Sequence, residues 1–166
     1  MVSTQQEKNN SQYPLSKQFK HRQLCEKAAS WLKTKCKQRC PVVFVEIKSI
    51  SMEIPDVIGF NCDHSVMIEV KTTRRDFLKD KEKPWRKYPE QGVGDFRYYF
   101  CPEGIIKEED LPEKWGLIWV DKSNRVRIVK EVVAWERNFS GEGWLNKHPK
   151  SNDKERNIMY SALRRL

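Results

Sequence analysis

The fold of this chain is decided by residues 54–71, which read IPDVIGFNCDHSVMIEVK. Two short apolar runs, at 54–60 and 66–71, are rich in the β-branched residues typical of strands. The residues between them, 61–65, have turn chemistry. We therefore predict a β-hairpin. Its apolar residues would face both sides of a sheet, so the strand pair is expected in the sheet interior, covered by helices.

The symmetry of the turn sets which residues of the two strands lie opposite each other. With the turn centred between Cys62 and Asp63, Asp56 is predicted directly opposite Glu69, and a bulge would shift this pairing by one residue. Side chains alternate along a strand, so Glu69 and Lys71 share a face, and in this register Asp56 points to it too. Two carboxylates and one ammonium are thus expected to converge.

This convergence predicts a metal site. Facing carboxylates repel each other, so Asp56 and Glu69 need a cation or a raised pKa. Oxygen ligands, with no His or Cys at ligand spacing, favour Mg²⁺ or Mn²⁺. Such an ion can polarise a phosphoryl oxygen and activate water, while Lys71 can orient that water or stabilise developing charge. The predicted chemistry is hydrolysis of a phosphodiester.

An ordinary structural explanation of Glu69 and Lys71 stays open. Charged residues make up 33% of the chain, so the two could form a solvated ion pair at a strand edge. A second Glu-x-Lys, at Glu46 and Lys48, shows that the pattern alone is weakly specific. Because no Pro-Asp hairpin precedes it, we interpret it as an ordinary strand end.

The other elements follow from hydrophobic periodicity and turn residues. Helices are predicted at 17–38, at 73–80 with Thr72 or Thr73 as N-cap, and at about 153–166. Further strands are predicted at 42–48, 96–101, 116–121 and 126–130, with a helical turn at 107–111 and an irregular segment at 138–152.

Composition predicts one domain at 16–166 after a disordered or loosely attached tail at 1–15. The net charge of +9 favours a polyanionic partner such as nucleic acid or an anionic membrane surface, or simply aids solubility. No run of 18 apolar residues and no signal peptide is present, which predicts a cytoplasmic protein without a membrane partner. The five cysteines contain no C-x-x-C and are expected to be reduced and structural. The histidines look isolated, and no nucleophile, base and orienter set can be assembled: His21, His64 and His148.

The order helix, three strands with Pro55-Asp56 and Glu69-Val70-Lys71, helix, strand resembles the PD-(D/E)XK nuclease superfamily over roughly residues 18–130. The resemblance implies an α/β restriction-endonuclease-like αβββαβ core, with a mixed central sheet flanked by helices. It also implies that Asp56 and Glu69 bind metal, that the Val70 carbonyl completes the inner shell, and that Lys71 is the catalytic lysine.

Many members of this superfamily add an acid from the first helix. Glu26 is the only acid within that predicted helix and is the candidate for a third carboxylate. The alternative is a surface glutamate paired with Arg22 or Lys27. Residues 69–100 further resemble the small MmcB-type DNA-repair nucleases, although the spacing from Lys83 to Tyr88 and the loop at 91–95 differ from that pattern.

The segment downstream of Lys71 is rich in Lys and Arg, which predicts contacts with nucleic-acid phosphates. The candidates are Arg74, Arg75, Lys81, Lys83, Arg86 and Lys87. Trp85 and Tyr88 lie inside this run and could stack on splayed bases, or simply pack in the protein.

Together these observations predict a Mg²⁺- or Mn²⁺-dependent DNA endonuclease acting in repair, recombination or defence on double-stranded or branched DNA. A homodimer would help double-strand cleavage. Two alternatives stay open: a nucleic-acid-binding module that does not cleave, and a protein-interaction factor on the same fold.

Overall fold

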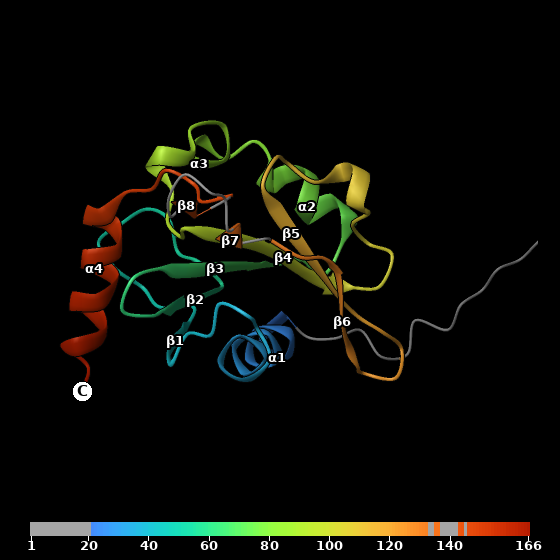
Figure 1. The fold of residues 1–166 in the computed structure, drawn as a ribbon, viewed down its shortest axis with the longest axis horizontal. Coiled ribbons are helices and arrows are strands. Elements are labelled where there is room, and N and C mark those ends of the chain that lie inside the picture. Colours follow the sequence, from blue (N-terminus) through green and yellow to red (C-terminus); the bar gives the residue numbers. More distant parts are fainter. Residues whose placement is uncertain (1–20, 133–134, 137–142, 145) are drawn as a thin grey trace, which may run out of the picture.

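The computed structural model describes residues 21–132, 135–136, 143–144 and 146–166, whose strands form a six-stranded sheet and a small two-stranded ribbon (Figure 1). The sheet has the order β1-β2-β3-β4-β5-β6. Neighbouring strands are antiparallel from β1 to β3 and from β5 to β6, and parallel from β3 to β5. The bounds are β1 Val42–Val45, β2 Val57–Phe60, β3 Ser65–Val70, β4 Phe96–Pro102, β5 Trp115–Val120 and β6 Val126–Lys130, with β7 Trp135–Glu136 and β8 Gly143–Trp144 in the ribbon.

Helices lie on both faces of this sheet (Figure 1). The described part of the chain contains α1 His21–Thr34, α2 Arg74–Asp80, α3 Pro84–Lys87 and α4 Asn152–Leu163, with 3₁₀ turns η1 Pro89–Gln91 and η2 Glu108–Asp110. The predicted α/β class, with a mixed sheet flanked by helices, is confirmed. Among the described residues, no helix combines the length and apolar character needed to cross a membrane.

The β2–β3 hairpin has the register that its turn symmetry predicts. Val57 pairs with Ile68 and Phe60 pairs with Ser65, without a bulge. The turn is closed by a hydrogen bond of 2.9 Å from the Asn61 N–H to the His64 carbonyl. Every residue of both strands is buried, which confirms that the pair lies in the sheet interior.

Alternation along β3 divides its side chains between two apolar layers. Ile68 and Val70 belong to the layer that contains the buried residues of α1, such as Leu32. Met67 belongs to the opposite layer, together with Phe77 of α2. Glu69 alternates with these residues and therefore projects on the side of α2, opposite α1.

Gly59 in β2 allows α1 and the segment after it to approach the sheet closely. A Cβ atom at this position would lie 2.6 Å from both Leu32 Cδ2 and Cys40 Cβ. Those distances are far inside van der Waals contact, so only glycine fits without movement of its neighbours. The position of α1, which carries part of the site described below, depends on this contact.

The predicted elements occur in the structure with shifted ends. The helix after β3 begins as expected, because Thr73 accepts a hydrogen bond of 3.2 Å from the Asp76 N–H. The strand predicted at 42–48 ends at Val45, because Glu46 has a positive φ of 47° that breaks the extended backbone. The short helix α3 was not predicted, although Pro84 in its first turn is a typical helix start.

Several sequence predictions concern residues beyond those that the structure describes. These are the tail at 1–15, the start of the first helix at 17–20, and residues 138–142 and 145 of the irregular segment at 138–152.

Replacing Gly59 by alanine should destabilise the protein by about 1–3 kcal/mol, the usual cost of overpacking a core. The added methyl group meets Leu32 and Cys40, so one of them must move. Urea unfolding of Gly59→Ala measures the change. Ser30→Ala, an exposed substitution on α1, should stay within about 0.5 kcal/mol. Equal stability of the two variants would contradict the packing argument.

Candidate metal and active site

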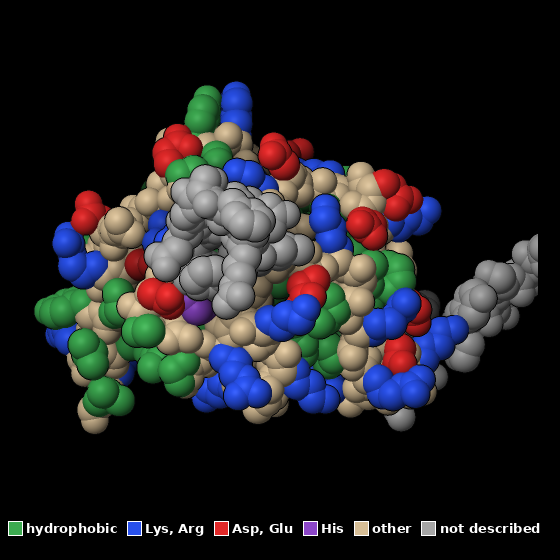
Figure 2. Space-filling model, in the orientation of Figure 1, with side chains coloured by type: hydrophobic (Ala, Val, Ile, Leu, Met, Phe, Trp, Pro, Cys, Tyr) green, Lys and Arg blue, Asp and Glu red, His purple; other side chains and the backbone are tan. Residues whose placement is uncertain are grey.

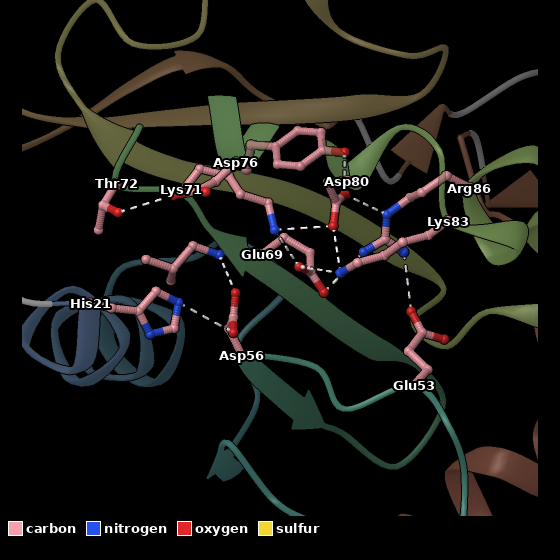
Figure 3. A network of polar contacts seen from close by, with 12 residues as sticks. His21, Glu53, Asp56, Glu69, Lys71, Thr72, Asp76, Asp80, Lys83 and Arg86 are labelled. Atoms are coloured by element: carbon pink, nitrogen blue, oxygen red, sulfur yellow. Dashed lines mark hydrogen bonds and ion pairs between the residues drawn. The ribbon is translucent and has the colours of Figure 1, made fainter. Parts of the chain in front are cut away.

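Asp56 immediately precedes β2 and is fixed by the backbone of both neighbouring strands. Its Oδ2 accepts a hydrogen bond of 2.8 Å from the Val70 N–H of β3. Its own carbonyl accepts one of 2.9 Å from the Glu46 N–H, which follows β1. The other carboxylate oxygen, Oδ1, lies 3.4 Å from His21 Nε2 on α1. Asp56 therefore lies between His21 and Glu69 (Figure 3).

This position differs in part from the prediction that Asp56 simply shares the face of Glu69 and Lys71. Regular β2–β3 pairing ends at Val57, one residue after Asp56. The Asp56 carboxylate contacts the β3 backbone and α1, whereas the Glu69 carboxylate contacts cations on the opposite side. The three predicted residues are neighbours, but Asp56 lies at the boundary between the two faces.

Glu69 and Lys71 belong to a buried ion-pair network that also contains Glu53, Asp80, Lys83 and Arg86 (Figure 3). Lys71 Nζ lies 2.8 Å from Glu69 Oε2 and 3.0 Å from Asp80 Oδ1. The solvated strand-edge pair considered from the sequence is wrong, because the Lys71 and Glu69 side chains are only 8% and 2% exposed.

Arg86 is the central cation of this network. It lies 2.8 Å from Asp80 Oδ2, 2.9 Å from Glu69 Oε1 and 3.1 Å from Glu53 Oε1. The contact with Glu69 is an ion pair without hydrogen-bond geometry, and among the described residues no donor satisfies the buried Oε1 of Glu69. One carboxylate oxygen of the predicted metal site is therefore left without a hydrogen bond.

The charges of the network set the protonation of its members. Burial opposes the charged form of Lys71, but Glu69 and Asp80 outweigh it and raise the pKa of Lys71 above its ordinary value. Burial also opposes ionisation of Asp80, but Arg86 and Lys71 outweigh it and hold the pKa of Asp80 well below its ordinary value. Lys71 is consequently an ammonium at neutral pH. It can stabilise negative charge and is not a general base.

Three members of this arrangement escaped the sequence analysis. Asp80 holds Lys71, Glu53 pairs with Arg86, and Tyr99 donates a hydrogen bond of 2.8 Å to Asp80 Oδ2. Asp80 lies among many other charged residues in the sequence, whereas Glu53 lies between Met52 and Ile54, and nothing local marks either as a partner of Arg86.

A second group of possible ligands lies on the α1 side of Asp56. His21, Cys25, Glu46 and Asp56 each offer one ligand atom, and these atoms all lie within 4.8 Å of one another. The expectation that His21 is isolated is therefore wrong. The hydrogen bond with Asp56 raises the pKa of His21, and burial followed by the Asp56 charge raises that of Cys25. Cys25 is thus a protonated thiol and not a nucleophile.

The predicted phosphate-binding residues fall into two groups: side chains that form ion pairs within the protein, and exposed side chains that could contact a nucleic acid. Arg86 is engaged, because its side chain is 3% exposed and bound to carboxylates, so its predicted contact with DNA is wrong. Arg74 forms two ion-pair contacts with Asp110, and Lys83 lies 2.6 Å from Asp80. Arg75, Lys81 and Lys87 are exposed; the ammonium groups of Lys81 and Lys87 lie over the rings of Phe77 and Tyr88, contacts weak enough at an exposed site for a phosphate to replace. On the face drawn in Figure 2, Lys and Arg side chains are spread among Asp and Glu side chains.

The remaining candidates are Trp85, Tyr88 and Glu26. Trp85 is half-buried beneath the Lys83 and Lys154 ammonium groups, whereas Tyr88 is 45% exposed. Glu26 is exposed and pairs with Arg22 at 3.2 Å, as the alternative interpretation of this residue proposed.

No family model, curated protein or solved structure matches this chain.

Replacing Arg86 by methionine should destabilise the protein by about 3–5 kcal/mol, because it leaves buried carboxylates without their shared partner. The matched control is the adjacent exposed Lys87→Met, which should change the free energy of unfolding by less than about 0.5 kcal/mol. Urea unfolding followed by circular dichroism compares the two. Similar effects at both positions would show that the network does not stabilise the fold.

Proposed function

We propose that the protein is a metal-dependent DNA endonuclease with a restriction-endonuclease-like core of the PD-(D/E)XK type. The observation that carries this proposal is that the β2–β3 hairpin, in the register that the sequence predicts, holds Glu69 and Lys71 as a buried ion pair and holds the Asp56 carboxylate against the N–H of Val70, the residue between them. Buried carboxylates beside a buried ammonium are costly for a protein to maintain, and such groups concentrate at functional sites.

The residues of the site fit a hard divalent cation. Asp56 and Glu69 offer carboxylate oxygens, and the Glu69 Oε1 atom is buried without a hydrogen-bond donor among the described residues. Val70 is held directly beside Asp56 by its N–H, so its backbone belongs to the same site. Oxygen donors of this kind suit Mg²⁺ or Mn²⁺. Either ion, when bound, would polarise a phosphoryl oxygen and activate water.

The protein's own residues would contribute charge and orientation. The Lys71 ammonium would stabilise the negative charge that develops on the phosphorus oxygens during in-line attack. Asp80 positions this ammonium from 3.0 Å and is itself held by the Tyr99 hydroxyl at 2.8 Å. Asp80 and Tyr99 are therefore positioning residues, and Lys71 is the catalytic residue that touches the reacting group.

Substrate binding would rely on exposed cations near this site. Arg75 and Lys81 belong to α2 or follow it directly, and Lys87 ends α3. α2 is the first element after the strand that carries Glu69, and α3 follows α2, so a phosphate backbone that reaches the metal would pass close to them. The exposed Tyr88 ring is available for stacking on a splayed base.

One observation favours a second candidate function, nucleic-acid binding without cleavage. The Glu69 carboxylate is already contacted by Lys71 at 2.8 Å and by Arg86 at 2.9 Å, where an active nuclease would use the same carboxylate for metal. In this case the protein would bind DNA in a salt-dependent manner and cleave under no divalent metal.

Asp56→Asn, Glu69→Gln and Lys71→Met should each reduce metal-dependent cleavage of plasmid or branched DNA by at least about 100-fold, the usual effect of losing one charge-stabilising group. The assay is single-turnover cleavage with Mg²⁺ or Mn²⁺, with folding checked by circular dichroism because Glu69 and Lys71 are buried. Lys79→Ala, an exposed change in α2, should retain activity. Cleavage that survives all three substitutions would assign the activity elsewhere.

Removing Arg75, Lys81 and Lys87 together as alanines should weaken DNA binding and reduce the slope of log affinity against log salt by about 3, roughly one unit per phosphate contact. Fluorescence anisotropy at several salt concentrations measures the slope. The control removes the same number of exposed charges elsewhere, at Lys33, Lys35 and Lys122. An equal loss in both triple variants would mean that only the net charge matters.

A further inference from the structure

Four side chains with different donor atoms meet on the α1 side of Asp56. His21 and Cys25 come from α1, Glu46 follows β1, and Asp56 precedes β2. His21 Nδ1 lies 3.5 Å from both Cys25 Sγ and Glu46 Oε1, and His21 Nε2 lies 3.4 Å from Asp56 Oδ1. Figure 3 shows the contact between His21 and Asp56.

The 3.5 Å separations of His21 Nδ1 from Cys25 and Glu46 match the edges of a small metal polyhedron, and one ligand atom from each of the four residues lies within 4.8 Å of the others. Zinc-to-ligand bonds of about 2.0–2.3 Å in a tetrahedron place neighbouring donor atoms about 3.3–3.8 Å apart. The amino-acid sequence explains the short distance between His21 and Cys25, because these residues are four positions apart on one helix and therefore share a face.

The backbone fixes the two carboxylates beside this helix face. β1–β2 pairing ends at Val45 and Val57, and the next residue of the chain, Glu46, donates its N–H to the Asp56 carbonyl at 2.9 Å. The position of α1 over these strands depends in turn on the close contact at Gly59. Three elements thus deliver one nitrogen, one sulfur and two carboxylate groups to one place.

We infer that His21, Cys25, Glu46 and Asp56 form a binding site for a borderline-soft divalent cation of the Zn²⁺ and Co²⁺ class. A mixed set of imidazole, thiolate and carboxylate donors selects such ions over Mg²⁺, which takes oxygen ligands almost alone. Binding converts the Cys25 thiol to a thiolate, and the proton is released to solvent.

Asp56 belongs both to this site and to the proposed nuclease site. An ion held by His21 and Cys25 also binds the Asp56 carboxylate. This carboxylate is then no longer available to the ion that the nuclease would use. Zn²⁺ is therefore expected to inhibit cleavage in Mg²⁺; this consequence rests on the proposed function, whereas the binding itself does not.

The test is a titration of the full-length reduced protein with Co²⁺, followed by absorption spectroscopy. One equivalent should produce a thiolate-to-cobalt charge-transfer band together with the intense visible bands of a low-coordinate Co²⁺ ion, and Zn²⁺ should abolish both. Cys25→Ser should remove the charge-transfer band. His21→Ala and Glu46→Gln, at half-buried and exposed positions, should weaken binding by at least about 10-fold.

Cys62→Ser is the matched control, because Cys62 is exposed beside Asp63 and His64 and offers an alternative thiolate site. The band should persist in this variant. A band that survives in Cys25→Ser, or one that disappears in Cys62→Ser, would overturn the assignment, as would the absence of any band. If Cys25→Ser fails to fold by circular dichroism, the affinities of His21→Ala and Glu46→Gln decide the question.

A second measurement separates this inference from the proposed function. Cleavage in Mg²⁺ is titrated with Zn²⁺, and His21→Ala should require at least about 10-fold more Zn²⁺ for half-inhibition of its own activity. Cobalt binding without any nuclease activity would support the metal site and contradict only the proposed function. Cleavage without cobalt binding would contradict only the metal site.

Discussion

Burial of the Glu69 charge is the constraint on which the rest of the site depends. A carboxylate that is 2% exposed in the middle of a sheet is tolerable only when cations match it, and Lys71 and Arg86 supply this match at 2.8 and 2.9 Å. Arg86 comes from α3, so the same contacts fix the segment after β3 against the sheet. The network therefore joins the chemistry of the hairpin to the packing of the following helices, and neither can change alone.

Local rules were enough to predict the hairpin and its register. The turn at 61–65 is symmetric, and every pair from Val57 with Ile68 to Phe60 with Ser65 follows from it. The start of α2 was equally predictable, because the Thr73 cap acts on its own helix. Arg86 could not be assigned in the same way. It lies in a run of basic residues, and only the tertiary structure brings Asp80 and Glu53 to it.

Asp56 shows that the alternation of side chains along a strand is a weaker guide at the strand end to which face of the sheet a side chain points. Its carboxylate satisfies the Val70 N–H and so reaches toward α1, where His21 lies 3.4 Å away. The prediction that no His or Cys stands at ligand spacing overlooked His21 and Cys25, which are four residues apart on one helix face, because the carboxylates they meet come from other elements. Glu46 looked like an ordinary strand end because its pairing with Asp56 is not encoded locally.

The network also contains the one contact that a divalent ion could most readily replace. Lys71 and Arg86 are buried and hold Asp80 as well as Glu69, so withdrawal of either cation would weaken the charge match of two buried carboxylates at once. Lys83 also holds Asp80, at 2.6 Å, but its side chain is 38% exposed and its contact with Glu69 Oε2 is longer, at 3.7 Å. Its ammonium can leave Glu69 and keep its shorter contact with Asp80, while Lys71 and Arg86 still match the Glu69 charge. A metal ion approaching Glu69 would therefore displace Lys83 from this carboxylate before it displaced Lys71 or Arg86.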